Sequence, residues 1–148
     1  MLEIRDCTDI EDAIELIREY SKIKGAESCF VSLEKELSDL ASYYEGGALL
    51  MGYEDGIPIA TVALKKISDK RAEIKRLYIR PEFRGKGYSR LMLEQVFSRC
   101  KELGFTEAYL TTRPDVMGVG YELYKKIGFQ ELGRENGAVS MLIQTEDL

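Results

Sequence analysis

Residues 71–92 have the sequence RAEIKRLYIRPEFRGKGYSRLM, and this stretch decides the fold. Its apolar and aromatic residues predict a strand over Arg71–Ile79, which Pro81 ends because proline cannot donate to a sheet ladder. A glycine-bearing loop, Arg84–Gly87, follows and leads into an amphipathic helix of about Ser89–Leu103. Free backbone amides and the helix dipole favour a phosphate at such a junction. We therefore expect this loop to hold a pyrophosphate.

The rest of the chain predicts further helices and strands around this stretch. Because a strand, a helix and a strand follow one another over residues 71–112, one parallel pair with a right-handed crossover is expected. The other strands have short turns, which favour antiparallel pairing. The additional strands are predicted at residues 2–5, 48–53, 57–66, 107–111, 129–132 and 139–143, and the additional helices from Thr8 or Asp9 to Gly25, from Ser32 to before Gly46, and over about 116–127.

The predicted order is β-α-α-β-β-β-α-β-α-β-β. This order is typical of an α+β (mixed α/β) domain with a single, mostly antiparallel sheet of about seven strands and about four helices. With 148 residues, the chain is long enough to bury one core, so residues 1–148 are expected to form a single domain.

Composition narrows the possible chemistry. The net charge of −5 argues against broad nucleic-acid binding and is weakly consistent with a cationic acceptor such as an amine. Histidine is absent, which excludes Ser-His and Cys-His catalysis and histidine metal sites, and we expect no metal. Three widely spaced cysteines, with neither an apolar run of spanning length nor a signal-peptide pattern, predict a reduced, cytoplasmic protein without a membrane partner.

Two motifs resemble those of the GNAT (Gcn5-related N-acetyltransferase) superfamily. The segment Arg84-Gly85-Lys86-Gly87-Tyr88-Ser89 resembles the acetyl-CoA signature Q/R-x-x-G-x-G/A, with Ser89 at its small last position. Residues 123–129, LYKKIGF, resemble the lYxxxGF segment near the family's C-terminus. The motifs occur in the family's order, about 40 residues apart, and the resemblance extends over essentially the whole chain.

The chain departs from the family pattern before the second motif. Members often carry Asn seven residues before the tyrosine of that motif and Ala four residues before it, whereas this chain has Met117 and Gly120. A cofactor contact through that Asn is therefore missing or replaced. Gly120 also weakens a helix by about 1 kcal/mol relative to Ala if it lies in the interior.

The resemblance implies a GNAT-like fold and transfer of an acetyl group from the co-substrate acetyl-CoA to a primary amine. Main-chain amides would hold the pyrophosphate, and the strand backbone would pair with the pantetheine arm. A main-chain amide would also meet the developing oxyanion. The implied cofactor-binding residues are Leu77, Ile79, Arg84, Gly85, Lys86, Gly87, Tyr88 and Ser89. A strand closed by its neighbour is the alternative for Leu77 and Ile79, and a purely structural turn is the alternative for the loop.

Two residues are candidate catalysts. Tyr124 is the candidate general acid for the departing thiol; its alternative is core packing, and Tyr121 is the other possible tyrosine. Glu73 falls where histone-acetylating members carry a strand glutamate, so it is the candidate base, directly or through a water. Its alternative is a surface carboxylate paired with Lys75 or Arg71.

Other assignments stay open. Arg90, Arg113 and Lys126 are candidates for the 3′-phosphate of CoA or are simply solvent-facing charges, and Cys100 is expected in the core. The acceptor is a small-molecule amine or a protein or peptide amine, and a homodimer is possible. Competing functions are a transferase for another acyl-CoA and a non-catalytic acyl-CoA-binding sensor or partner module. A P-loop enzyme is disfavoured because the Walker spacing is not met.

Overall fold

The computed structural model describes the backbone of all 148 residues and the side chains of all except Ser28. Seven strands form one sheet in the order β1-β2-β3-β4-β5-β7-β6, and every neighbouring pair is antiparallel except β4–β5. The predicted mixed α/β class and mostly antiparallel sheet are therefore confirmed. The strands are β1 (Glu3–Asp6), β2 (Ala48–Glu54), β3 (Ile57–Lys66), β4 (Arg71–Ile79), β5 (Glu107–Thr112), β6 (Gln130–Glu135) and β7 (Ala138–Gln144).

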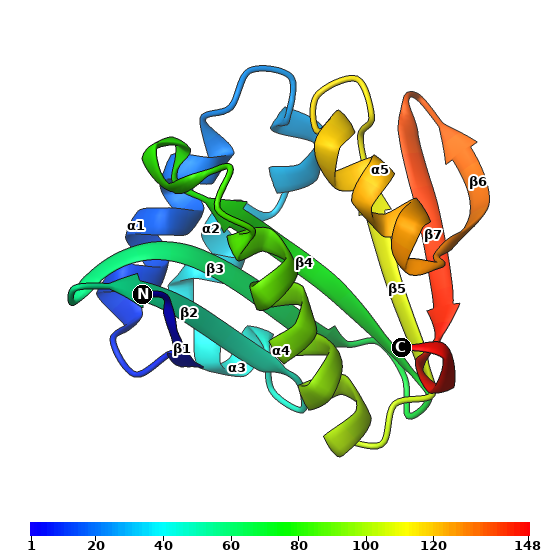
Figure 1. Ribbon diagram of the computed structural model, residues 1–148, viewed down its shortest axis with the longest axis horizontal. Helices are drawn as coiled ribbons and strands as arrows, with labels where there is room; N and C mark the ends of the chain where they lie inside the picture. Colours follow the sequence, from blue (N-terminus) through cyan, green and yellow to red (C-terminus); the bar gives the residue numbers. More distant parts are fainter.

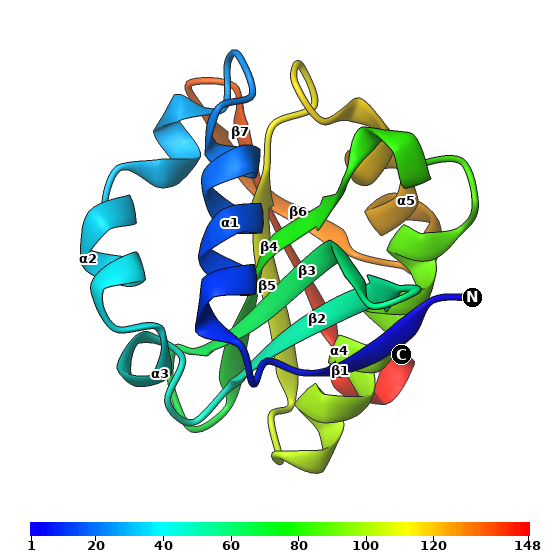
Figure 2. The same cartoon turned by 90° about the vertical axis from the view of Figure 1, so that its left-hand side faces the viewer.

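Helices cover both faces of the sheet (Figures 1 and 2), and an apolar core lies on each side. One core lies beneath α4 and α5, and the other lies between the sheet and α1–α3. The helices are α1 (Ile10–Ser21), α2 (Leu33–Ser38), α3 (Leu40–Tyr43), α4 (Tyr88–Glu102) and α5 (Gly118–Ile127), with short 3-10 helices η1 (Glu27–Phe30), η2 (Pro81–Phe83) and η3 (Thr145–Asp147). Cys100 is fully buried in the first core, as predicted.

The second predicted helix is divided in two at Asp39. This residue has an extended backbone, with φ −157° and ψ 80°, and its carboxylate accepts a hydrogen bond from the amide of Ser42. An aspartate that caps a new helix start interrupts the preceding helix. The pattern LSDLASYY keeps helical spacing through this point, so hydrophobic periodicity alone predicted one continuous helix.

The sheet opens in the middle, between its two parallel strands. Residues Arg71–Glu73 of β4 pair with Glu107–Tyr109 of β5, and pairing ends there. Figure 1 shows the two strands close together near the C-terminus and diverging beyond it. The outer half of β4 therefore keeps β3 as a neighbour on one edge and has no strand on the other edge.

A β-bulge at Arg76 lies where the sheet opens. Two residues of β4 face one residue of β3 there, because the register shifts between Thr61 and Ala63. Arg76 has a positive φ of 59°, which is unusual for a residue other than glycine. As a result, Lys75 and Arg76 both point toward α1–α3 although they are adjacent in sequence.

Most element boundaries match the sequence expectation closely. The limits of β4 and β3 are those predicted, whereas α1 ends at Ser21 before the expected Gly25, and α5 begins at Gly118 rather than near residue 116. None of the helices in the described part of the chain is long and apolar enough to cross a membrane.

Candidate active site

A large cleft occupies the opening between β4 and β5. Its volume is about 1780 Å³, and its walls come from β4, β5, α1, α5, the β6–β7 hairpin and the loop before α4. The cleft is thus lined on one side by the core beneath α4 and α5 and on the other by the α1–α3 side. A long ligand can lie along the free edge of β4 and reach both sides.

The glycine loop forms one end of this cleft. Gly85 and Gly87 have φ values of 80° and 79°, and Gly87 is the N-cap of α4 without a side-chain cap. Among the described residues, no backbone carbonyl accepts a hydrogen bond from the amides of residues 85–89. A Cβ atom built on either glycine meets nothing within 4 Å. The loop therefore has uncapped donors and open space at a helix N-terminus, which is what an anionic group requires.

Cationic side chains surround the loop. Arg84 donates from Nε to the carbonyl of Ile79 at 2.8 Å and lies over the ring of Tyr78, and Lys86 lies over the ring of Phe83. These contacts fix the two cations without neutralising them. Arg90 also lines the cleft, so three cationic side chains lie at or beside this end.

Among the three 3′-phosphate candidates, Arg90 and Arg113 line the cleft and Lys126 lies outside it. Arg113 donates to the carbonyl of Asn136 and pairs with Asp115 at 3.2 Å. Its guanidinium therefore already has carboxylate and carbonyl partners. Arg90 lies in the first turn of α4, directly after the glycine loop, and it also lines the cleft.

Glu73 lies in the cleft wall at the last paired position of β4. Its neighbours Ala72 and Ile74 enter the core beneath α4, so its own side chain points to the opposite, α1–α3 side. No lysine or arginine of the described residues pairs with it within 4 Å, and Arg71 pairs instead with Glu107 at 3.1 Å. The expected alternative, a carboxylate paired with Lys75 or Arg71, is therefore not formed. Burial raises the pKa of Glu73, although Lys75, Arg76 and Lys65 lower it in part.

Tyr124 lies on the other side of the opening. It is 8% exposed, packs edge-on against Phe129 with ring centroids 5.7 Å apart, and lines the cleft. Burial strongly raises the pKa of its hydroxyl, with a smaller contribution from Tyr20. Tyr124 thus packs in the core and also lines the cleft.

Tyr121 has a different environment. Its hydroxyl hydrogen-bonds to Glu131 and accepts a hydrogen bond from Arg134 at 2.9 Å, and the residue does not line the cleft. The Tyr121 hydroxyl is therefore bound by Glu131 and Arg134 outside the cleft. Of the two tyrosines considered from sequence, Tyr124 alone reaches the cleft.

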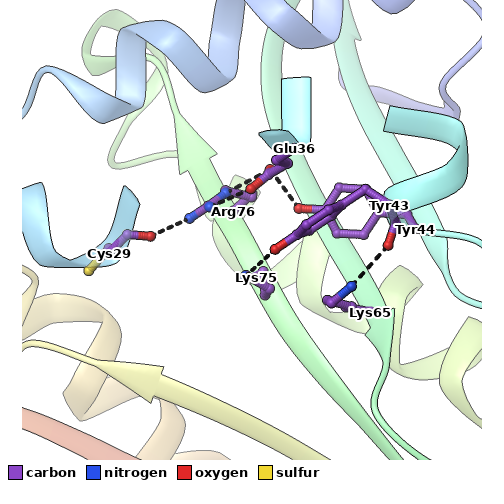
Figure 3. A network of polar contacts seen from close by, with 7 residues as sticks. All are labelled: Cys29, Glu36, Tyr43, Tyr44, Lys65, Lys75 and Arg76. Atoms are coloured by element: carbon purple, nitrogen blue, oxygen red, sulfur yellow. Dashed lines mark hydrogen bonds and ion pairs between the residues drawn. The ribbon is translucent and has the colours of Figure 1, made fainter. Parts of the chain in front are cut away.

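A buried ion pair supports the β4 bulge (Figure 3). Arg76 donates from Nε and Nη2 to Glu36 at 3.0 and 2.6 Å, and the Tyr44 hydroxyl donates to the same carboxylate at 2.7 Å. Arg76 also donates to the carbonyl of Cys29 at 3.0 Å, which ties η1 to the sheet. Burial opposes the charge of Glu36, but these hydrogen bonds outweigh it and hold its pKa low.

Sequence reasoning missed this pair, since the two charges lie 40 residues apart and neither belongs to a recognised motif. The sequence offers one hint that Glu36 is buried: it is next to Leu37, and both residues lie on the buried side of α2. That signal is weak without the structure.

Met117 takes up the position where the family often has Asn. Its sulfur accepts a hydrogen bond from the Tyr20 hydroxyl at 3.0 Å, and α5 begins directly after it without a side-chain cap. Tyr20 in turn stacks on Tyr78 with centroids 5.1 Å apart. The replacement thus links α1 to α5 across the outer end of the cleft.

Comparisons with known proteins agree with this geometry. The chain is 29% identical to an uncharacterised N-acetyltransferase of Schizosaccharomyces pombe over 126 residues, which cover 82% of this chain and 77% of that protein. It is 23% identical over 112 residues to a mouse N-acetyltransferase family 8 protein, covering 69% of this chain and about half, 48%, of the mouse protein.

A solved structure gives the same fold. The PaiA N-acetyltransferase of Thermoplasma acidophilum, in complex with coenzyme A, superposes with a TM-score of 0.76 at 26% identity, covering 97% of this chain and 99% of that one. The Acetyltransferase (GNAT) family itself matches residues 11–129. The two sequence motifs, the opened sheet and this match lead to one conclusion: the chain belongs to the GNAT acetyltransferase family.

Proposed function

We propose that residues 1–148 form one acetyl-CoA-dependent N-acetyltransferase domain that transfers acetyl to a primary amine by direct attack on the thioester. The observation that carries this proposal is the free outer edge of β4, which runs from Glu73 to the uncapped glycine loop. Coenzyme A bound to the Thermoplasma acidophilum neighbour supports the choice of cofactor.

The donor would bind along this edge. The amides of Arg84–Ser89 hold the pyrophosphate, and the backbone of Leu77 and Ile79 pairs with the pantetheine arm as an added strand would. This places the thioester near the bulge at Arg76, where β4 has no strand neighbour on its outer edge. A main-chain amide near Leu77 is then available to the oxyanion.

The two candidate catalysts lie on opposite sides of this edge. Glu73 faces α1–α3 and takes the proton that the acceptor ammonium must lose. The neutral nitrogen then attacks the thioester carbonyl, so a C–N bond forms while the C–S bond breaks. Tyr124, on the α5 side, gives its hydroxyl proton to the departing thiolate. The nitrogen releases its second proton to solvent as the amide forms, and a proton from solvent restores the Tyr124 hydroxyl. A raised pKa suits both roles, because it makes Glu73 a stronger base and keeps Tyr124 protonated.

The test is thiol release from acetyl-CoA with a panel of primary amines, together with calorimetric titration of acetyl-CoA. We expect binding and amine-dependent turnover. Binding without turnover on any amine would instead identify an acyl-CoA-binding module. Faster turnover with a longer acyl-CoA would show that acetyl-CoA is not the preferred donor. Absence of acetyl-CoA binding would remove the proposal altogether.

A further inference from the structure

Two oppositely charged side chains form part of the acceptor side of the cleft. Glu73 and Lys75 are two residues apart in β4, so they point to the same side and their Cα atoms are separated by about 6.6 Å. Both line the cleft. They precede the bulge at Arg76, where the sheet opens, so both lie beside the expected position of the thioester.

Neither charge forms an ion pair with another described residue. The arginines that line this side each have a carboxylate partner; the pairs are Arg71–Glu107, Arg76–Glu36, Arg113–Asp115 and Arg134–Glu131. Among the described residues, no carboxylate lies within 4 Å of the Lys75 ammonium and no cation lies within 4 Å of Glu73. An unpaired charge in a partly buried wall is costly unless a ligand pairs with it.

The Lys75 ammonium is held by an aromatic ring rather than by an anion (Figure 3). It lies 3.3 Å from the Tyr43 hydroxyl and 5.5 Å from the ring centroid. Lys65 lies over the same ring at 3.9 Å and donates to the Tyr43 carbonyl. An ammonium has three donors, and the Tyr43 hydroxyl uses one of those of Lys75. Two donors are thus left for a ligand in the cleft.

The two charges in this wall balance each other, unlike the charge of the whole chain. Glu73 contributes one negative charge and Lys75 one positive charge, so the pair is neutral while the chain carries −5. A pair of this kind complements an acceptor that itself carries one charge of each sign.

We propose that the acceptor is an amino-acid-type molecule, an amine with a carboxylate a few bonds from its nitrogen. Glu73 receives the amine and Lys75 binds the carboxylate. The short interval between the two residues favours a small molecule that spans both charges over a larger one in which they are distant. This inference rests on the proposed function and adds the class of acceptor.

The experiment compares acceptors that differ only in the carboxylate. Each of a set of amino acids is assayed beside its amide and its decarboxylated amine, at saturating acetyl-CoA. We expect kcat/KM to be at least tenfold higher for the acid than for either neutral analogue. In Lys75→Gln, KM for the acid should rise at least tenfold while KM for the amide stays the same.

Two further variants serve as controls. Lys75→Arg keeps the charge and should keep a preference for the acid. Lys66→Gln removes an equal charge from an exposed position of β3 outside the cleft and should leave both KM values unchanged. A rise in KM for acid and amide alike in Lys75→Gln, or an equal effect of Lys66→Gln, would contradict a direct contact.

The outcomes separate this inference from the proposed function. Equal turnover of neutral amines and amino acids by the unaltered protein would overturn the inference and leave the N-acetyltransferase in place. Thiol release with none of the acceptors, despite acetyl-CoA binding, would overturn both.

Discussion

Glu73 and Tyr109 are the last residues at which β4 and β5 pair, and the sheet opens directly beyond them. The candidate base therefore lies at the point of divergence itself. One end of the free β4 edge is a half-buried carboxylate, and the other is the uncapped start of α4. This arrangement permits specific tests at each end.

The first prediction concerns the glycine loop. Gly87→Ala should weaken acetyl-CoA binding at least tenfold by calorimetry, because the new methyl group enters the open space expected for the pyrophosphate. The positive φ also costs about 1–2 kcal/mol for any L side chain, so the variant will lose stability as well. Gly104→Ala is the matched control, since Gly104 has a φ of 88° and equally open surroundings at the far end of α4. It should lose similar stability and keep full affinity; equal affinities in both variants would end the pyrophosphate assignment.

The second prediction concerns pH. A general base works only when deprotonated, and the pKa of Glu73 is raised by burial. The rate should therefore increase with pH through a value above the usual glutamate range. Glu73→Gln should lower kcat by about 10²–10⁴-fold and remove this limb of the pH–rate profile, with acetyl-CoA affinity unchanged. A variant that retains the limb would show that another group accepts the proton.

The third prediction separates two tyrosines. Tyr124→Phe should lower kcat much more than it weakens acetyl-CoA binding, because it removes the proton donor and keeps the ring packed on Phe129. Tyr121→Phe is the control, since its hydroxyl is engaged by Glu131 and Arg134 outside the cleft. Steady-state kinetics should show a near-normal kcat for Tyr121→Phe. An unaltered kcat in Tyr124→Phe would exclude it from the mechanism.

The fourth prediction concerns the buried ion pair. Glu36→Gln leaves Arg76 charged and buried, so the free energy of unfolding should fall by roughly 3–5 kcal/mol in urea. Because the pKa of Glu36 is lowered in the folded state, its stabilising effect is present above the ordinary carboxyl pKa and is lost as pH falls through the lowered value. The difference from the unaltered protein should therefore shrink in acid.

Glu34→Gln is the control for that measurement. Glu34 lies in α2 like Glu36, and it forms a bidentate pair with Arg18 of α1 in which both side chains are solvent-exposed. The unfolding transition of Glu34→Gln should coincide with that of the unaltered protein. If both variants lose the same stability, burial does not account for the effect at Glu36.

Local patterns were enough to predict much of the fold. The limits of β4 follow from its own residues and from Pro81, and the hairpin of β2 and β3 follows from the Glu54-Asp55-Gly56 turn. The glycine loop was predicted as well, since helix starts and glycines have short-range signals. Cys100 was placed in the core by helical spacing alone.

Long-range relationships were not predictable from the sequence alone. Nothing near Arg76 indicates a positive φ or a carboxylate partner 40 residues away. The division at Asp39 depends on a cap that competes with an intact helical pattern. The Tyr20–Met117 contact joins residues 97 apart. Each of these depends on which surfaces meet after folding.

The bulge at Arg76 also fixes how the length of β4 can change. Side chains alternate along a strand, so an extra residue exchanges the faces of everything that follows unless a bulge absorbs it. Arg76 is such an absorbed residue, because Lys75 and Tyr78 are three residues apart while their β3 partners Ala63 and Thr61 are two apart. Removing Arg76 would restore regular alternation and leave Tyr78 in the α1 core and Ile79 beneath α4. Removing one residue from the regular part of β4 before the bulge would instead exchange the faces of the residues between the deletion and the bulge. We therefore expect the bulge to be the position in β4 where the loss of one residue changes the acceptor face and the donor loop least.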